Sequence, residues 1–200
     1  MSQERPEALK STVFTVPNVL SLFRILLVPV FLRAILARRP TEALLVFVLA
    51  SLTDLLDGFA ARVWHQRSKL GTILDPAGDK LLMTASFVVL TIPRLGAPNG
   101  IPFALTALVF GRDIMIVAGA GYAFASWGQK SFAPSLLGKM STACQVGAVF
   151  LVLWLNHLRI AASYMPWVFR ITALVTVASG VYYFVEGLSI LRAHRKIKSI

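Results

Sequence analysis

The sequence predicts an all-α integral membrane protein, a bundle of six transmembrane helices preceded by a short interfacial helix. The first reason is composition, because 56% of the 200 residues are hydrophobic, only 14% are charged and the mean hydropathy is +0.72. Such values are typical of membrane proteins rather than soluble domains. The second reason is that apolar runs recur along the chain, each close to the roughly 20 residues that cross the hydrocarbon core as a helix. We expect a single membrane domain over residues 1–200.

The six spans are predicted from the apolar runs and from the polar or turn-forming residues between them. They cover residues 19–36, 41–63, 74–92, 103–126, 136–155 and 168–191. Residues 4–16 are mixed and partly amphipathic, so we expect the interfacial helix there. Asp75 followed by Pro76 is a helix-start signal, since aspartate caps the first turn and proline suits its first position. Residues 94–102 are rich in glycine and proline and are expected to form a turn-rich connection.

The distribution of lysine and arginine predicts which side of the membrane each loop faces. Most of these cations lie before residue 11, in the 62–69 loop, in the 130–139 loop and after residue 191. The positive-inside rule places these segments, and therefore both termini, in the cytoplasm. Attraction to anionic membrane lipids then accounts for the net charge of +11, and no nucleic-acid partner is expected. The single Cys144 lies in an apolar run, which argues against a disulfide framework or a cysteine metal site.

Four of the nine acidic residues cluster at the end of the second predicted span and the start of the third. They are Asp54, Asp57, Asp75 and Asp79. An aspartate at the centre of a bilayer costs about 2.5–3.5 kcal/mol, so this group needs compensation. The first two are spaced i, i+3 and the last two i, i+4, so each pair shares one face of its helix. Because a cytoplasmic loop joins the two helices, we expect the pairs to converge near that surface.

Four converging carboxylates cannot all stay ionised without cations, so the cluster predicts a divalent metal site. Oxygen ligands with no nearby cysteine suit Mg²⁺, Mn²⁺ or Ca²⁺, and four carboxylates are enough for two ions that clamp a phosphoryl displacement. Gly58 and Gly71 would let a phosphate approach the backbone. Arg62 could bind a diphosphate, and Ser68 could donate from its hydroxyl. Alternatively, the glycines serve helix packing, and Arg62 and Ser68 are solvated at a loop edge.

The whole stretch reads Asp54-x2-Asp57-Gly58-x2-Ala61-Arg62-x8-Gly71-x3-Asp75-x3-Asp79. These eight residues at this spacing resemble the signature of the CDP-alcohol phosphatidyltransferase family. The resemblance implies a six-helix membrane enzyme, often a homodimer, that transfers a phosphatidyl group from CDP-diacylglycerol to an alcohol and releases CMP. It also implies that the four aspartates hold two divalent cations, Mg²⁺ or Mn²⁺, and that Asp79 is the general base and thus the catalytic residue.

The resemblance further implies which residues contact the CDP part of the donor. From the signature and the loop inside it, they are Gly58, Ala61, Arg62, Ser68 and Gly71. The opening PNVLSLFR looks like the family's first helix, which adds Asn18, Ser21 and Arg24. Arg24 lies well inside the first span and is expected to face the protein interior. Asn18 and Ser21 could instead serve as helix caps.

The acceptor alcohol must be inferred from the second half of the chain. Family members that use glycerol-3-phosphate carry Arg-Glu with a second arginine eight residues after the first, and later Gly-Lys-x-Lys-Thr. This chain has Arg112-Asp113, then Ala120, and reads Gly-Lys-Met-Ser-Thr over residues 138–142. Each difference removes a cation that a dianionic phosphate would favour. We therefore expect phosphatidylglycerol as the acceptor, as in members that make cardiolipin, with glycerol-3-phosphate as the alternative. Arg112, Asp113 and Lys139 are the expected acceptor-binding residues, although the first two could form a purely structural ion pair.

Other function classes remain open for the aspartate stretch. A cation transporter would explain the carboxylates, but an arginine at position 62 beside a cation pathway would oppose it. A scaffold that binds the nucleotide lipid without catalysis is a further alternative, although all four aspartates are present. Glu186 is the lone acid of the last predicted span and is expected to pair within the bundle.

Overall fold

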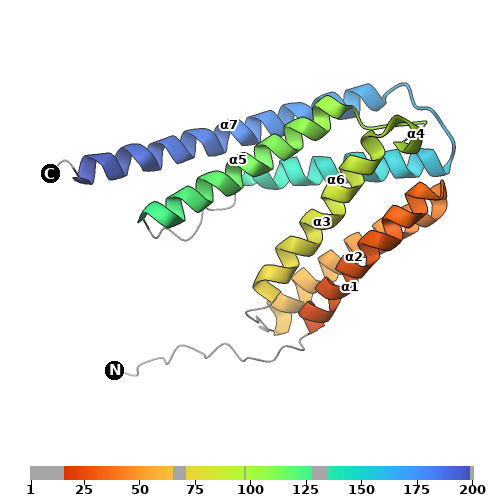
Figure 1. The fold of residues 1–200 in the computed structure, drawn as a ribbon, viewed down its shortest axis with the longest axis horizontal. Coiled ribbons are helices and arrows are strands. Elements are labelled where there is room, and N and C mark those ends of the chain that lie inside the picture. Colours follow the sequence, from red (N-terminus) through yellow and green to blue (C-terminus); the bar gives the residue numbers. More distant parts are fainter. Residues whose placement is uncertain (1–15, 65–70, 97, 128–134, 199–200) are drawn as a thin grey trace. The chain divides into compact units, whose positions relative to one another are not determined.

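The computed structural model of the chain describes residues 16–64, 71–96, 98–127 and 135–198. Within these ranges all regular structure is helical, as the sequence predicts (Figure 1). The helices are α1 (Val16–Leu36), α2 (Pro40–Trp64), α3 (Gly71–Thr91), α4 (Pro93–Gly96), α5 (Phe103–Trp127), α6 (Leu136–His157) and α7 (Met165–Lys198). Contacts divide the chain into two units, Met1–Leu90 and Thr91–Ile200.

The observed helices match the six predicted spans at most of their ends. α1 ends at Leu36, α5 begins at Phe103 and α6 begins at Leu136, as predicted. The start of α3 differs from the prediction. The helix begins at Gly71, so Asp75 and Pro76 lie inside it and the predicted helix start at these two residues is wrong. Two further differences have simple causes. α4 forms at the start of the predicted turn-rich connection, because proline suits the first position of a helix. α7 continues through the basic tail to Lys198, since a helix can outlast its apolar run. The predicted interfacial helix lies almost entirely outside the described residues.

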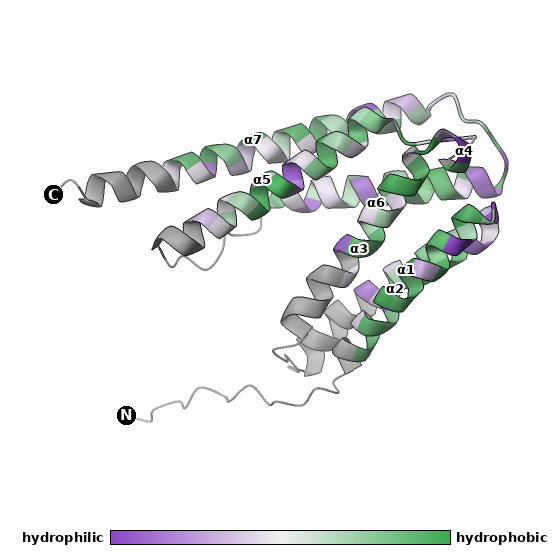
Figure 2. Cartoon of the chain, in the orientation of Figure 1, coloured by the Kyte–Doolittle hydropathy of each residue, from purple (hydrophilic) through white to green (hydrophobic). Residues whose placement is uncertain are grey.

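Four of the described helices are long and apolar enough to cross a membrane. Their apolar windows are Val19–Leu36, Phe103–Tyr122, Leu136–His157 and Met165–Ser189. Large apolar side chains face outward on these helices, and Figure 2 shows the apolar colour along much of α1, α5 and α7. Only 17% of the α5 window is buried, so most of that helix is available to lipid. The chain is therefore a multi-pass membrane protein, and the other two predicted spans fall on α2 and α3.

In the first unit, α1 packs along α2 through small and aromatic side chains. The buried small residues are Ala34, Ala43 and Ala50. The rings of Phe31 and Phe47 lie between the helices with their centroids 6.4 Å apart. Small residues let helix backbones approach closely, which matters in a bilayer because lipid leaves little hydrophobic drive for helix association. Nearer its N-terminal end, α1 buries the polar residues Ser21 and Arg24.

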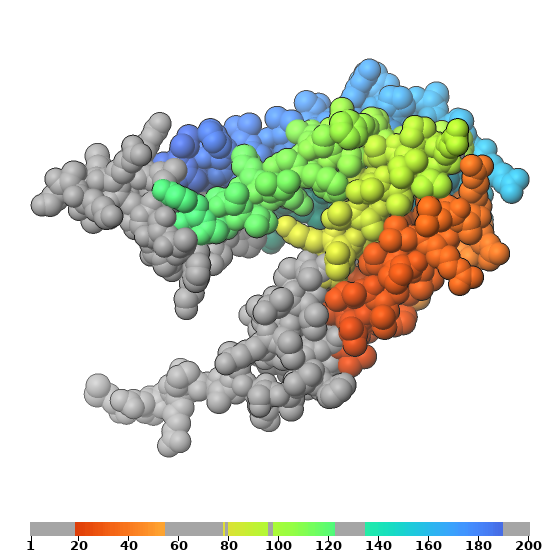
Figure 3. All heavy atoms as spheres, viewed as in Figure 1, coloured from red at the N-terminus to blue at the C-terminus, as the bar shows by residue number. Residues whose placement is uncertain are grey.

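In the second unit, α7 packs against both α5 and α6. The space-filling view shows α5 (green) lying against α7 (blue) (Figure 3). These two helices run parallel, because the first turns of both line a common pocket. The most deeply buried apolar residues of α6 are Ala148, Val149, Val152 and Leu153.

Hydrogen bonds between Asn99 and Asn156 connect the segment before α5 to the end of α6. The Asn99 backbone N–H donates to Oδ1 of Asn156 at 2.9 Å, and Asn99 Nδ2 donates to the carbonyl of Ile160 at 2.6 Å. The N–H of Ala162 donates in turn to Asn99 Oδ1 at 3.0 Å. Both asparagines are buried, so these bonds satisfy groups that would otherwise be costly in an apolar setting. They hold the starts of α5 and α7 close together.

Two helices end with an arginine in the left-handed backbone conformation. The φ angle is 55° at Arg38, after α1, and 57° at Arg159, after α6. In both places the next residue's N–H donates to the carbonyl five residues earlier, at 2.9 and 3.0 Å. This is a Schellman motif, in which glycine is the usual residue.

Candidate functional site

Three helices of the first unit meet at Arg24 of α1. Its side chain is 1% exposed, and its Nη1 lies 2.7 Å from Oδ1 of Asp54 on α2. On α3, a Cβ added at Gly78 would lie 3.8 Å from Arg24 Cδ and 3.5 Å from the carbonyl oxygen of Ser21. Arg24 therefore forms an ion pair with Asp54 of α2 and lies beside Gly78 of α3. As predicted, it faces the protein interior.

This junction brings the two aspartate-bearing helices to one place. Asp54 belongs to it directly, and Asp79 is the next residue after the buried Gly78 on α3, with Asp75 one turn earlier. The contacts of Arg24 with Asp54 and Gly78 place α2 and α3 beside the same side chain, and the convergence of the four carboxylates stays a prediction. The side chains of Asp57, Asp75 and Asp79 lie outside the described residues, and among the side chains that are described no three metal-binding groups gather.

Asp54 has the properties of a ligand for a hard cation. Its side chain is 45% exposed, and its contact with Arg24, among the described residues, is made through Oδ1. The other oxygen can bind a cation, and carboxylate oxygens are the ligands that Mg²⁺ prefers in proteins. The donor chemistry at this position therefore fits a divalent ion.

Two of the predicted donor-binding residues lie at the same junction. Ser21 and Arg24 are both buried on α1. Ser21 lies beyond the first turn of α1, so the helix-capping alternative is wrong for this residue. The remaining predicted donor-binding residues lie outside the described side chains: Asn18, Gly58, Ala61, Arg62, Ser68 and Gly71.

In the second unit, the predicted acceptor residues Arg112 and Asp113 form an ion pair. Arg112 Nη1 donates to Asp113 Oδ1 at 2.7 Å, and Arg112 Nη2 donates to Ser179 Oγ of α7 at 2.9 Å. The guanidinium also lies over the ring of Tyr183, 5.6 Å from its centroid. Arg112 Nε is buried and has no hydrogen-bond partner in the described part of the chain. One N–H donor of this cation is thus unsatisfied within the described part of the chain.

Tyr183 links Arg112 to the start of α6. Its hydroxyl accepts a hydrogen bond from the N–H of Ser135 at 3.1 Å. Ser135 is the N-cap of α6, and its Oγ accepts from the N–H of Gly138 at 3.0 Å. Lys139, the third predicted acceptor residue, follows Gly138 and is exposed. Sequence reasoning missed Ser179 and Tyr183, and the only signal for them was two polar groups four residues apart in an apolar span.

Gly138→Ala is expected to destabilise the second unit. The added Cβ would lie 2.7 Å from Tyr183 Oη and 3.1 Å from Ser135 Oγ. Overpacking of this kind costs about 1–3 kcal/mol, so the unfolding temperature of the protein in detergent should fall. Adding Tyr183→Phe should recover part of the loss, because it removes the clashing oxygen.

Gly147→Ala is the matched control, since a Cβ there would meet no atom within 4 Å. Equal unfolding temperatures for the Gly138 and Gly147 variants would contradict the contact between Gly138 and Tyr183.

Ser141, which marks one of the differences from glycerol-3-phosphate enzymes, forms a buried polar cluster with Gln145 and with Thr176 of α7. Gln145 Nε2 donates to Ser141 Oγ at 3.1 Å and to Thr176 Oγ1 at 3.3 Å. The two hydroxyl oxygens lie 3.2 Å apart. Such bonds hold neighbouring helices together in a membrane. Gln145 therefore has a helix–helix role in this structure.

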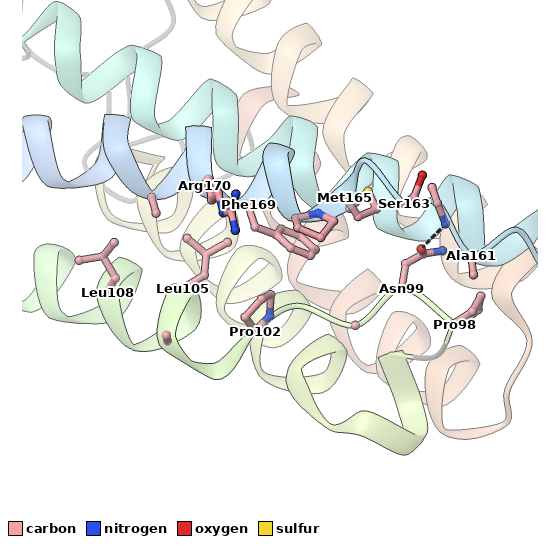
Figure 4. A pocket seen from close by; sticks show the side chains of 15 residues that line it. Pro98, Asn99, Pro102, Leu105, Leu108, Ala161, Ser163, Met165, Phe169 and Arg170 are labelled. Carbon is pink, nitrogen blue, oxygen red and sulfur yellow. Dashed lines mark hydrogen bonds between the residues drawn. The ribbon is translucent and has the colours of Figure 1, made fainter.

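An apolar pocket lies at the N-terminal ends of α5 and α7 (Figure 4). Leu105 and Leu108 face Phe169 across it, and Arg170 lies at its edge. At its rim, Asn99 accepts the hydrogen bond from Ala162 that is dashed in Figure 4. None of the predicted site residues lines this pocket, so it is distinct from the acceptor residues around Arg112.

Comparison with known proteins agrees with the signature. Residues 14–181 match the family model described as CDP-alcohol phosphatidyltransferase. A cardiolipin synthase (CMP-forming) of Homo sapiens is 37% identical over 191 residues, which cover 87% of this chain and 62% of that protein. A Rattus norvegicus protein of the same description matches to the same extent. An Escherichia coli (strain K12) CDP-diacylglycerol--glycerol-3-phosphate 3-phosphatidyltransferase is 31% identical over 173 residues, covering 85% of this chain and 93% of that protein. The chain thus spans less than two thirds of the mammalian relatives and nearly all of the bacterial one.

Proposed function

Since the chain belongs to the CDP-alcohol phosphatidyltransferase family, we propose that it transfers a phosphatidyl group from CDP-diacylglycerol to an alcohol and releases CMP, in glycerophospholipid synthesis. The observation that carries the proposal is the junction at Arg24, which draws together the helices that bear the four aspartates. CDP-diacylglycerol has a charged diphosphate and two acyl chains. The aspartates lie on helices that expose large apolar side chains, among them Leu45 on α2 and Leu81 on α3.

The four aspartates are proposed to hold two divalent cations, Mg²⁺ or Mn²⁺. Asp54 fits this role because its carboxylate is 45% exposed and has a second oxygen besides the one that contacts Arg24. When bound, such ions would neutralise charge on the diphosphate and on the leaving CMP. Arg24 would contribute a fixed positive charge to the same junction, which lowers the repulsion between an acidic protein site and an anionic substrate. The same guanidinium disfavours a cation transporter, because it takes a carboxylate oxygen that a transported ion would need.

Asp79 is proposed as the general base. It would take the proton from the acceptor hydroxyl, whose oxygen then attacks the phosphorus that carries diacylglycerol. The bond from that phosphorus to the bridging oxygen breaks, and CMP leaves with the electron pair. Arg62 would bind the diphosphate and oppose the charge that develops on CMP. Gly58 and Gly71 would keep side chains away from the donor, with Asn18, Ser21, Ala61 and Ser68 around it.

Phosphatidylglycerol is the proposed acceptor, so the product would be cardiolipin. Arg112 has one unengaged donor and a charge already paired with Asp113, which suits a single phosphodiester better than a dianion. Lys139 is the proposed third contact. Glycerol-3-phosphate is the alternative, favoured by the match to the bacterial relative over 93% of its length.

The proposed membrane arrangement has six spans, with both termini and the aspartate junction on the cytoplasmic side. Lysine and arginine are concentrated in the corresponding loops, which supports this orientation. We also propose a homodimer, as the family resemblance implies.

The first test is CMP release by the purified protein in lipid micelles that contain CDP-diacylglycerol. Phosphatidylglycerol and glycerol-3-phosphate are supplied in separate reactions, each with Mg²⁺, with Mn²⁺ or with a chelator. We expect CMP with phosphatidylglycerol, no release in chelator and recovery when metal is returned. CMP with glycerol-3-phosphate alone would keep the family reaction and contradict the acceptor. The absence of metal-dependent CMP with both acceptors would overturn the proposed function.

A further inference from the structure

The pocket at the starts of α5 and α7 has an apolar floor and an exposed rim (Figure 4). Leu105, Met165 and Phe169 form the floor, and each is at most 8% exposed. At the rim, Pro98 and Arg170 are exposed. The pocket has a volume of about 730 Å³, which is within the range of about 300–1,000 Å³ for ligand sites. All of its lining residues belong to the second unit, so this unit alone can hold a ligand there.

The pocket lies across the start of two apolar windows. The windows of α5 and α7 begin at Phe103 and Met165. Part of the lining, such as Leu108, lies within these windows, and part, such as Pro98, lies before them. Trp167 is 63% exposed at the same level, and tryptophan is enriched where hydrocarbon meets the headgroup region. A ligand in the pocket would therefore meet hydrocarbon at one end and the membrane surface at the other.

Positive charge collects around the pocket. Arg170 lies at its edge. The connections that lead into α5 and α7, residues 92–102 and 158–164, add Arg94 and Arg159 and contain no aspartate or glutamate. The positive-inside rule does not explain these arginines, because we propose that both connections lie on the non-cytoplasmic side. An anionic ligand would offset their charge.

The acidic residues of the second unit do not neutralise Arg170. There are only two of them, and Asp113 pairs with Arg112 at 2.7 Å. Glu186 follows Arg170 by 16 residues on the same helix, which places it roughly 24 Å away. The buried Oε2 of Glu186 has no hydrogen-bond partner among the described residues, so the expected pairing of Glu186 is wrong for this oxygen. Arg170 therefore has no carboxylate partner within its own unit.

We propose that this pocket binds an anionic membrane phospholipid. One acyl chain lies on the apolar floor, and the phosphate accepts hydrogen bonds from Arg170. The Arg170 Cζ lies 4.8 Å from the ring centroid of Trp167, and this cation–π contact holds the guanidinium at the pocket edge. No hydrogen bond or ion pair within the described part of the chain engages its N–H groups, so they are free to bind phosphate oxygens. The proposal goes beyond the proposed function, in which no residue of this pocket takes part.

Charge favours a phospholipid over a purely apolar occupant. An apolar helix or peptide would cover the floor but would leave the cation without a partner. A phospholipid satisfies both parts of the pocket, because it carries an acyl chain and a phosphate a short distance apart. Under the proposed orientation, this lipid comes from the non-cytoplasmic leaflet.

The test measures lipid binding by the purified protein in neutral detergent, without donor and with a chelator, so that no reaction takes place. Phosphatidic acid is the anionic probe, because it has no free alcohol that could act as an acceptor. Diacylglycerol with the same acyl chains is the comparison and differs only in lacking the phosphate. Native mass spectrometry over a range of lipid concentrations gives an apparent Kd for each lipid. We expect phosphatidic acid to bind at least about tenfold more tightly than diacylglycerol, since hydrogen bonds to a charged group are gained.

Arg170→Gln removes the charge at the pocket edge. The Kd for phosphatidic acid should rise about tenfold, and the Kd for diacylglycerol should stay near that of wild type. Arg33→Gln is the matched control, since Arg33 is also an exposed arginine inside an apolar window but belongs to the first unit. It should leave the binding of both lipids unchanged.

Ala104→Trp tests the apolar part of the pocket. Ala104 lines the pocket and is exposed, so a larger side chain there is expected to occupy the space of the acyl chain. Binding of both lipids should weaken at least about tenfold, because apolar contact area is lost. Ala107→Trp makes the same change at an exposed residue of α5 outside the lining, and it should bind as wild type does. If Ala104→Trp does not fold, Arg170→Gln decides.

Equal affinity of the wild type for the two lipids, or an equal loss for both in Arg170→Gln, would overturn the binding of a phosphate at Arg170. Binding by Ala104→Trp that matches Ala107→Trp would show that the lipid does not occupy this pocket. None of these measurements depends on CMP release, so the proposed function is tested separately.

Discussion

Replacing Asp79 with asparagine is expected to remove nearly all metal-dependent CMP release. General acid–base catalysis contributes about 10²–10⁴ to an enzymatic rate, and Asp79 is proposed as both the base and a metal ligand. The loss should therefore reach at least about 10²-fold in kcat. The measurement is CMP formed from CDP-diacylglycerol and phosphatidylglycerol at saturating Mg²⁺ or Mn²⁺.

The structure explains why this variant should still fold. Asp79 follows Gly78, and it is the glycine that packs beside Arg24 and Ser21. An asparagine at position 79 is nearly the same size as the aspartate and leaves that contact unchanged. Gly78→Ala makes a useful comparison, because its Cβ would lie at ordinary contact distances of 3.5 Å and more, so its activity should stay near that of wild type. An Asp79→Asn protein that unfolds at the wild-type temperature and keeps full activity would show that another group is the base.

The helices could be predicted well because each apolar run has a clear end. Pro40 and Phe103 stand where a polar or turn-forming connection meets an apolar run, and α2 and α5 begin there. The end of α7 was missed, since hydropathy marks where a helix leaves the apolar region and not where its backbone bonds stop. α4 was missed for a related reason, because a four-residue helix has no period that a sequence window can detect.

Some features of the candidate site depend on residues that are close in the sequence and could be predicted. Others depend on contacts between residues far apart in the sequence and could not. The aspartate pairs are visible from their spacing within two neighbouring helices, and the burial of Arg24 follows from its place inside an apolar run. The bond from Arg112 to Ser179 joins residues 67 positions apart, so no local pattern reveals it. The clash that makes Gly138 necessary depends on Tyr183 from another helix. These contacts come from how α5, α6 and α7 pack, which composition and periodicity do not specify.

Arg24→Met is expected to lower both activity and stability. The Arg24 cation is proposed to serve the donor, and loss of a charged hydrogen bond of about 1.5–3 kcal/mol reduces kcat/KM by at least about tenfold. Breaking a fully buried ion pair costs about 3–5 kcal/mol, but Asp54 is 45% exposed and water can partly replace its partner. We therefore expect a loss of about 1–2 kcal/mol in the free energy of unfolding.

Adding Asp54→Asn to Arg24→Met separates the two roles of Asp54. If Asp54 only balances the charge of Arg24, neutralising both partners should restore stability and part of the activity, because the carboxylate of Asp54 is then no longer left without its cation. If Asp54 is also a metal ligand, stability should recover while CMP release falls further, and more Mg²⁺ or Mn²⁺ should be needed for half-maximal activity. We expect the second result. Unfolding temperature and metal titration of both variants decide between the two, and activity that recovers together with stability would remove Asp54 from the metal site.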